Sequence, residues 1–334
     1  MSDSLIIIPT YNEKENIEIL SSKQNLDDFG RLLNETWYLK RGISKKISKI
    51  HMTTTTKLWR IIDLINWGTD HFTTKGLDNA RREMEWFLCE VLSCQRIDLY
   101  VRFEEIMNED ELEVFRTMVK RRISGEPFQH IIGKAPFYGR DFIVNQNVLI
   151  PRPETEILIE RIKTNGSVNS LLDIGTGTGC IAITVGLENL ADKIFATDIS
   201  ESTIEIAKDN MKLHQVENIR FAHHDFLKQN FKTKFDVVIS NPPYIGTNEM
   251  NTLQAEVQDY DPPSALTDNG DGLSFYHRFA EQFENLLTND GYLLLEFGGN
   301  AQKQAVESIF QNAGLKTEFF EDLQNDWRIV EVRR

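Results

Sequence analysis

The second half of the chain repeats one pattern, in which a short apolar segment is followed by a segment with helical periodicity. The apolar segments are SLLDIG, KIFATD, NIRFAHHD, FDVVIS and GYLLLEFG, which begin at Ser170, Lys193, Asn218, Phe235 and Gly291. Apolar strands that alternate with helices predict a parallel sheet with helices on both faces. The final segments, LKTEFF and WRIVEV, have a short connection, so one of them can run antiparallel at the edge. The pattern therefore predicts an α/β domain with a mostly parallel sheet.

Upstream of this domain the predicted elements are helical. Apolar residues recur three and four positions apart in residues 58–67, 80–94 and 108–125, which predicts three amphipathic helices in a small bundle. The large side chains on their apolar faces are expected in the core of the bundle: Trp59, Trp67, Trp86 and Phe87. Residues 137–145 place Gly139 between two short segments rich in aromatic and β-branched residues, which predicts a hairpin between the two lobes.

The composition bears on the class of protein. No apolar run reaches the roughly 18 residues of a membrane span, so we expect a cytoplasmic protein without membrane contact. The net charge of −14 disfavours a protein that mainly grips a phosphate backbone, since such proteins usually present a concentrated basic surface. The small basic clusters at residues 44–49, 81–82 and 120–122 are interpreted as solvated helix faces. The cysteines lack metal-ligand spacing, and no metal site is expected.

A glycine-rich segment, DIGTGTG, closes the first predicted strand and opens a helix. Its glycines, Gly175, Gly177 and Gly179, have no Cβ and let the backbone approach a ligand closely. The dinucleotide-binding fingerprint needs its third glycine three residues after the second, and Cys180 occupies that position here. The spacing instead resembles the first motif of class I methyltransferases, whose cofactor, S-adenosylmethionine, carries no phosphate.

Polar residues stand at the ends of four predicted strands: Asp173, Asp198, Asp225 and Asn241. The carboxyl ends of parallel strands share one edge, where open α/β sheets bind ligands. The Asp198 carboxylate is placed to accept hydrogen bonds from ribose hydroxyls. Asp225 and Phe226 could hold the amino group and the face of an adenine, or could form a helix cap with a buried ring. Together with the glycine-rich segment, these residues predict a cofactor site.

The segment SNPPY, which begins at Ser240, ends a predicted strand in two prolines that cannot continue a sheet ladder. The Asn241 side-chain oxygen and the Pro242 carbonyl can each accept one hydrogen of an –NH₂ group, which would fix a weakly nucleophilic planar nitrogen for in-line methyl transfer. Pro243 stiffens the tip, and the ring of Tyr244 offers a wall for a planar acceptor. We therefore predict methylation of a planar –NH₂, with Asn241, Pro242 and Tyr244 catalytic and Asn241 to Tyr244 forming the acceptor site.

Planar –NH₂ groups occur in glutamine side chains and in nucleic-acid bases, and NPPY occurs in methyltransferases of both. From about Lys57 to the C-terminus, however, the chain resembles the release factor glutamine methyltransferases, the HemK/PrmC family. The resemblance rests on five segments in the family's order: GEPFQHIIGKAPFYGRDFIVNQNVLIPRPETEILIE, DIGTGTG, NPPYI, YDPPSALTDNGDGLSFY and GYLLLEFG. IPRPETE is the most specific part, because DNA methyltransferases lack it.

The resemblance implies a Rossmann-like class I methyltransferase domain with a seven-stranded, mostly parallel sheet, over residues 151–334. It implies a helical substrate-recognition domain over residues 52–126 and a β-hairpin linker over residues 127–150. S-adenosylmethionine is the implied cofactor, and the glutamine in the Gly-Gly-Gln motif of class I peptide chain release factors is the implied acceptor. Motif matching and the strand ends assign these residues to the cofactor: Asp173, Gly175, Thr176, Gly177, Thr178, Gly179, Asp198, Asp225, Phe226 and Asn241.

The roles of three residues stay open. Phe226 occupies a place that can hold Trp in the family. In IPRPETE, Arg152 and Glu154 could order the cofactor loop or cap the following helix.

The beginning of the chain departs from this family. Residues 5–20, LIIIPTYNEKENIEIL, resemble the opening of glycosyltransferases such as dolichol-phosphate mannose synthases. No acidic metal-binding motif of that family follows, so glycosyltransferase activity is not expected. We expect residues 1–51 to be a loosely ordered, dispensable extension, because Met52 would be a natural start.

Two alternative functions stay open at this point. A methyltransferase acting on the exocyclic amine of adenine in nucleic acid is disfavoured by the acidic balance and by the absence of an obvious target-recognition domain. A non-catalytic binding protein that keeps the cofactor fold predicts that loss of Asn241 leaves function unchanged.

Overall fold

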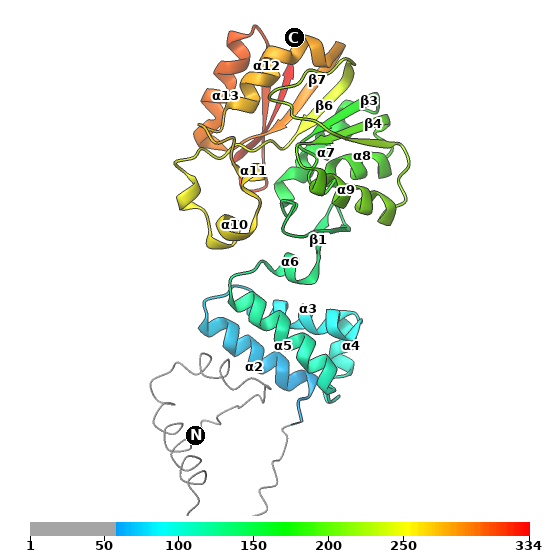
Figure 1. Cartoon of the computed structure of the whole chain (residues 1–334), viewed down its shortest axis with the longest axis vertical. Coiled ribbons are helices and arrows are strands. Elements are labelled where there is room, and N and C mark those ends of the chain that lie inside the picture. The colour runs from blue at the N-terminus through cyan, green and yellow to red at the C-terminus, as the bar shows by residue number, and fades with distance from the viewer. Residues whose placement is uncertain (1–57) are drawn as a thin grey trace, which may run out of the picture. The chain divides into compact units, whose positions relative to one another are not determined.

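A seven-stranded sheet forms the centre of the C-terminal part of the chain in this computed structural model, which describes residues 58–334 (Figure 1). The strand order is β5-β4-β3-β6-β7-β9-β8. The strands are β3 (Val168–Ile174), β4 (Ala191–Asp198), β5 (Ile219–His223), β6 (Phe235–Ser240), β7 (Leu287–Glu296), β8 (Lys316–Glu321) and β9 (Trp327–Arg333). The strands from β5 to β7 in this order pair in parallel, and β9 pairs antiparallel with β7 and β8. The predicted mostly parallel sheet of seven strands is confirmed.

The sequence predicted an antiparallel strand at the edge of the sheet. The antiparallel strand is β9, and it lies between β7 and β8 instead. The burial of the two last strands explains the difference. In β9, the side chains of Ile329, Val330 and Val332 are completely buried, whereas every residue of β8 is at least partly exposed. A strand buried on both faces belongs inside a sheet, and a partly exposed strand tolerates the edge.

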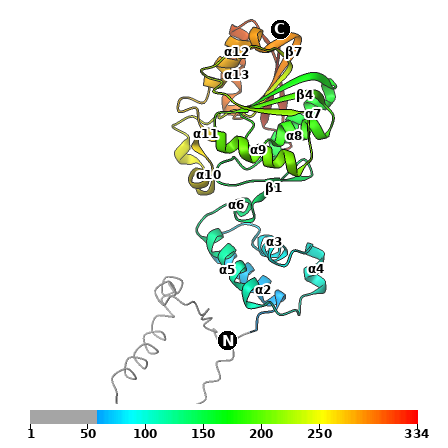
Figure 2. The same ribbon diagram turned by 45° about the vertical axis from the view of Figure 1, so that its right-hand side comes forward.

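Helices cover both faces of the sheet (Figures 1 and 2). The helices α7 (Glu156–Asn165), α8 (Cys180–Leu187) and α9 (Glu201–Leu213) pack on one face, and α12 (Ser274–Leu286) and α13 (Asn300–Asn312) on the other. Successive strand residues point to opposite faces, so Leu171 joins the first core and Leu172 the second. Two short helices, α10 (Ala255–Tyr260) and α11 (Pro263–Leu266), lie between β6 and α12 in the chain.

The first part of the described chain is helical, with α2 (Ile61–Thr74), α3 (Ala80–Leu92), α4 (Arg96–Val101), α5 (Glu109–Ile123) and α6 (Phe128–Ile132). α2, α3 and α5 correspond to the three predicted helices. The α5 helix begins with a capping box, in which Asn108 Oδ1 accepts from Glu111 N at 2.9 Å and Asn108 N donates to the Glu111 carboxylate at 2.8 Å. α4 and α6 are six and five residues long, too short for the sequence period to indicate them.

The aromatic side chains of this region are only partly in its core. Trp59 and Phe87 are buried, and Trp67 is half-buried, but Trp86 is 40% exposed, so its predicted core position is wrong. The buried stripe of α3 runs through Met84, Phe87 and Leu88, and Trp86 lies beside it. Its ring packs against Phe128 at a centroid distance of 5.3 Å.

The predicted hairpin is present as β1 (Lys134–Phe137) and β2 (Arg140–Ile143), which pair antiparallel. Its two turn residues, Tyr138 and Gly139, both have positive φ, 51° and 72°, as a tight two-residue hairpin turn requires. The completely buried Asn210 of α9 bonds the backbone N and O of Ile143 at 2.6 and 3.0 Å and Thr178 O at 2.9 Å. One side chain thus ties the hairpin to the glycine-rich segment.

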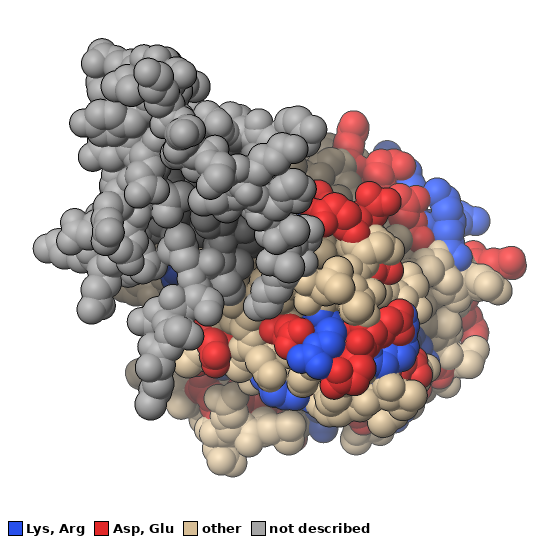
Figure 3. Space-filling view, turned by 90° about the horizontal axis from the view of Figure 1, so that it is seen from below, with Lys and Arg blue, Asp and Glu red and all other residues tan. Residues whose placement is uncertain are grey.

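Several basic side chains in the described part of the chain are paired with acidic ones. Arg81 contacts Glu85 at 2.8 Å, and the buried Arg122 contacts Glu83 at 2.7 Å, so the interpretation of residues 120–122 as a solvated helix face is wrong for Arg122. On the coloured part of the surface in Figure 3, which belongs to the described residues, Lys and Arg lie among Asp and Glu. Within residues 58–334 no helix is long and apolar enough to cross a membrane. The expectations for residues 1–51, 5–20 and 44–49 lie outside the described residues.

Candidate active site

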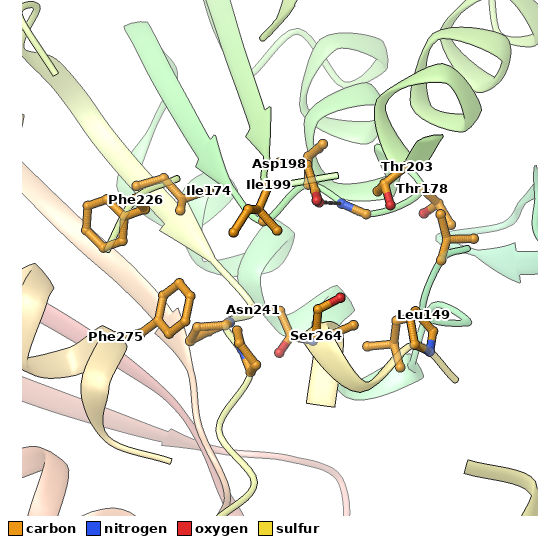
Figure 4. A pocket seen from close by; sticks show the side chains of 18 of the residues that line it. Leu149, Ile174, Thr178, Asp198, Ile199, Thr203, Phe226, Asn241, Ser264 and Phe275 are labelled. Atoms are coloured by element: carbon orange, nitrogen blue, oxygen red, sulfur yellow. Dashed lines mark hydrogen bonds between the residues drawn. The ribbon is translucent and has the colours of Figure 1, made fainter. Parts of the chain in front are cut away.

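A cavity lies at the carboxyl ends of the parallel strands, where β3 is flanked by β4 on one side and β6 on the other. This is the switch point at which open α/β sheets bind ligands, because the connections from neighbouring strands leave in opposite directions. Figure 4 shows residues from distant segments around one opening: Leu149, Ile174, Thr178, Asp198, Phe226, Asn241, Ser264 and Phe275.

The glycine-rich segment forms one wall of the cavity. Gly175 and Gly177 line it with φ of 73° and 56°, and a Cβ added to either would meet no protein atom within 4 Å. Such a Cβ would occupy the space left for a ligand. Gly179 differs, because its Cβ would lie 3.0 Å from Ile183 Cδ1 and 3.2 Å from Ala207 Cβ, so its missing side chain serves the packing of α8 on α9.

Asp198 and Asp173 both accept hydrogen bonds from the glycine-rich segment. Asp198 lines the cavity, and its carboxylate accepts from Gly177 N at 3.1 Å and Ser200 N at 3.0 Å. Burial raises the pKa of Asp198. Asp173 is completely buried, does not line the cavity and accepts from the Thr176 hydroxyl at 2.6 Å. Burial raises the pKa of Asp173 to about 7.

Asp225 and Phe226 line the cavity at the end of β5. The Asp225 carboxylate contacts Lys228 Nζ at 2.8 Å, and this hydrogen bond lowers its pKa. Phe226 is buried and packs on Phe279 at a centroid distance of 4.6 Å, so one side of its ring is held by the core. The structure thus brings these two residues to the same cavity as the glycine-rich segment.

The tip of β6 contributes Asn241, Pro242 and Pro243 to the cavity, but not Tyr244. The ring of Tyr244 packs against the second core, and its hydroxyl donates to Glu296 Oε1 at 3.4 Å. The structure therefore does not place this ring as a wall of the cavity. Asn241 Nδ2 donates to Thr155 Oγ1 at 3.1 Å. Within residues 58–334, neither Asn241 Oδ1 nor the Pro242 carbonyl accepts a hydrogen bond, so both oxygens stay available.

Two residues that the sequence did not single out complete this tip. Thr155 donates its hydroxyl to Glu296 Oε2 at 2.7 Å, and both side chains are buried. Burial raises the pKa of Glu296 to about 7. Both residues lie in segments already noted, IPRPETE and GYLLLEFG. A carboxylate within an apolar strand was the available signal for Glu296, but its partner lies 141 positions away.

Arg152 also lines the cavity, but it provides no side-chain cap to the 3₁₀ helix η2 (Pro153–Thr155). Its guanidinium instead contacts the buried Asp261 at 2.8 Å. This ion pair ties IPRPETE to the segment after α10, whose residues Pro262, Ser264 and Ala265 also line the cavity.

The chain matches two protein-family models and has close curated relatives. A PrmC N-terminal domain matches residues 63–133, and a methyltransferase small domain matches residues 153–272. The release factor glutamine methyltransferase of Bacillus cereus is 37% identical over 282 residues, which cover 81% of this chain and 98% of that protein. The protein of the same name from Geobacter sulfurreducens is 35% identical, and the match covers 79% of this chain and 92% of that protein. The one from Chlorobaculum tepidum is 39% identical, and the match covers 72% of this chain and 86% of that protein.

Proposed function

Because the chain belongs to the release factor glutamine methyltransferases, an S-adenosylmethionine-dependent family, we propose the following reaction for it. A methyl group is transferred from S-adenosylmethionine to the side-chain amide nitrogen of the glutamine in the Gly-Gly-Gln motif of peptide chain release factors. The observation that carries this proposal is that Asn241 and Pro242 line the same cavity as the glycine-rich segment, and that within residues 58–334 neither Asn241 Oδ1 nor the Pro242 carbonyl accepts a hydrogen bond.

The cofactor would occupy the cavity between β3, β4 and β5. The open space next to Gly175 and Gly177 would let the cofactor lie against the backbone of these glycines. The Asp198 carboxylate offers lone pairs for ribose hydroxyls. Asp225 and Phe226 would contact the adenine, and Asp173 and Gly179 would support the loop without touching the ligand. We also assign Thr176, Thr178 and Asn241 to this site. When bound, S-adenosylmethionine supplies an electrophilic methyl group.

The acceptor amide would be held by the tip of β6. Asn241 Oδ1 and the Pro242 carbonyl each accept one hydrogen of the –NH₂ group, which fixes the direction of the nitrogen lone pair. As the N–C bond forms and the bond between the methyl carbon and the cofactor sulfur breaks, positive charge would pass to the nitrogen, and the two oxygens would stabilise it. One of the two hydrogens would then leave as a proton to solvent. Pro243 keeps this tip rigid. Tyr244 would support the tip indirectly, through the hydrogen bond from its hydroxyl to Glu296.

The competing substrate is the exocyclic amine of adenine in nucleic acid. The pairing of basic with acidic side chains, as for Arg81 and Arg122, favours a protein substrate over a phosphate backbone. Incubation with methyl-labelled S-adenosylmethionine and either a release factor or adenine-containing DNA decides between them. We expect label in the release factor only, and label in DNA alone would contradict the proposal.

We further propose that the helical region before the hairpin recognises the release factor and that the enzyme acts in the cytoplasm. These two proposals follow from the family's substrate, which is a component of translation.

A further inference from the structure

The side-chain amide of Asn241 has two ends, and only one of them can serve the proposed reaction. An –NH₂ acceptor needs Oδ1 in the cavity, because Nδ2 would set hydrogens against hydrogens. The two orientations differ by a half-turn about the Cβ–Cγ bond and have nearly the same shape. Packing alone therefore does not select between them, and a hydrogen-bond partner must do so.

The buried chain from Asn241 to Glu296 supplies this selection. Thr155 has one hydroxyl proton, and the 2.7 Å contact with Glu296 Oε2 directs it to a carboxylate, the stronger acceptor. Thr155 Oγ1 can then only accept, and it takes a hydrogen from Asn241 Nδ2 at 3.1 Å. Thr155 and Glu296 are 3% and 1% exposed, so bulk water does not compete for these contacts. As a result, Oδ1 is the end that faces away from Thr155.

We propose that Glu296, acting through Thr155, is a positioning residue that sets which end of the Asn241 amide faces the acceptor, and that proton uptake by Glu296 reverses this orientation and stops methyl transfer. With a proton on Oε2, Glu296 donates to Thr155 Oγ1, and the Thr155 hydroxyl proton turns toward Asn241. The Asn241 amide then rotates so that Oδ1 accepts this proton. In both arrangements each contact from Asn241 to Glu296 pairs one donor with one acceptor, and the two differ by one proton taken from solvent. The effect on rate rests on the proposed function, but the orientation itself does not.

The surroundings of Glu296 place this proton uptake near neutral pH. Burial raises the pKa of Glu296 to about 7, against the opposing effects of the Thr155 hydrogen bond and the positive charge of Arg328. Tyr276 Oη donates to the backbone carbonyl of Glu296 at 2.8 Å, not to its carboxylate. The titratable, polar and charged groups that face Glu296 are Thr155 and Glu154 of η2, Cys180 at the start of α8, Tyr244 after β6, Tyr276 of α12 and Arg328 of β9.

The orientation can be measured without any substrate. The whole protein is labelled with ¹⁵N-asparagine, and the side-chain signals of Asn241 are assigned by their loss in Asn241→Asp. Between about pH 8 and pH 5.5 we expect these signals to shift with a single midpoint near the pKa of Glu296. In Thr155→Val, which keeps the shape but lacks the hydroxyl, most of this shift should disappear. In Thr155→Ser, which keeps the hydroxyl, it should remain.

A rate measurement gives the functional readout. Single-turnover methylation of a release factor at saturating cofactor should fall about tenfold per pH unit below the midpoint in the wild type and in Thr155→Ser. Thr155→Val should be slower at pH 8 by about tenfold or more and should lack this decline. A decline caused by Asp173 or Asp261, whose pKa values burial raises to about 7 and about 6, would persist in Thr155→Val. The Kd for S-adenosylmethionine should stay within about threefold.

The outcomes separate this inference from the proposed function. Asn241 signals that do not titrate in the wild type, or a Thr155→Val variant that keeps both the titration and the rate, would overturn the positioning role. A wild-type enzyme that leaves release factors unmethylated would refute the proposed substrate, while the Asn241 signals would still decide the orientation. Should Thr155→Val fail to fold, the titrations of the wild type and Thr155→Ser decide it.

Discussion

At the scale of single residues, Asn241 should contribute more to holding the acceptor than to cofactor affinity. Asn241 lines the cavity, and within residues 58–334 its Oδ1 accepts no hydrogen bond, so removal of this side chain takes away one of the two oxygens proposed to hold the acceptor nitrogen. We expect Asn241→Ala to lower kcat by about 10²–10³-fold, the range for loss of one donor or acceptor at a reacting centre. The Kd for the cofactor should change by less than about threefold. Steady-state kinetics with a release factor and calorimetric titration of the cofactor measure the two quantities.

Asp198→Ala is the matched control for this variant. The Asp198 carboxylate lines the cavity from the cofactor side and also holds Gly177 N. Its loss should raise the cofactor Kd by about tenfold or more, while kcat at saturating cofactor falls less than in Asn241→Ala. Equal loss of cofactor affinity in both variants would contradict the division between the two sides of the cavity.

Glu296 should make the protein's stability depend on pH in an unusual direction. Its pKa is about 7 in the folded protein, against an ordinary value of 4.5. Between these pH values the folded state holds the extra proton, so the contribution of Glu296 to the free energy of unfolding falls as pH rises. In Glu296→Gln this loss is absent. The variant should therefore gain stability relative to the wild type from pH 5 to pH 8, up to about 3 kcal/mol.

Urea denaturation at several pH values measures this difference. The gain should be accompanied by a loss of methylation rate, because a glutamine does not fix the direction of the Thr155 proton. A difference in the free energy of unfolding that stays constant or shrinks with rising pH would show that the carboxylate is not disfavoured by burial.

The sequence indicated some of these residues and missed others for a physical reason. Asp198 and Asn241 are local to their strands, so the end of an apolar segment was enough to place them at one edge. Thr155 and Glu296 act through a contact between distant segments, and no local pattern reports it. Tyr244 follows the same strand tip as Asn241, yet its ring turns to the core, because the direction of a side chain after a proline pair is set by tertiary packing.

At the scale of elements, the segment between β3 and α8 combines two kinds of glycine. Gly177→Ala would add a methyl group to the cavity at a positive φ. Gly76→Ala is a matched control, because Gly76 also has a positive φ, 75°, with nothing within 4 Å of its Cβ, but it does not line the cavity. Both variants should lose about 1 kcal/mol of stability from backbone strain. Only Gly177→Ala should also lose cofactor affinity, by about tenfold or more.

Thermal unfolding and calorimetric titration of these two variants check this prediction. Equal cofactor affinity in Gly177→Ala and Gly76→Ala would mean that the space above Gly177 is not used by the cofactor.

The elements differ in how well their sequences predicted them. The α5 helix carries its own start signal at Asn108 and a full amphipathic period, so local chemistry defines it. The short helices α4 and α6 give too few residues for a period. The place of β9 between β7 and β8 depends on which of the last two strands is buried on both faces, and that is a property of the assembled sheet.

At the scale of the whole molecule, each cavity residue and each contact named in the proposed reaction lies within residues 58–334. We therefore propose that residues 1–51 are dispensable and that their deletion leaves the kcat and KM for a release factor within about twofold. Purified full-length and shortened enzymes compared under the same conditions test this. A shortened enzyme that folds, as judged by its thermal unfolding, but does not methylate would contradict it.

The most direct test of the central claim is tandem mass spectrometry of a peptide chain release factor after incubation with the enzyme and S-adenosylmethionine. If Asn241 and Pro242 hold a side-chain amide, one methyl group appears on the glutamine of the Gly-Gly-Gln motif, and Asn241→Ala nearly abolishes it. A methyl group at another residue, or an unchanged yield with Asn241→Ala, would contradict the claim that these two oxygens position the acceptor nitrogen.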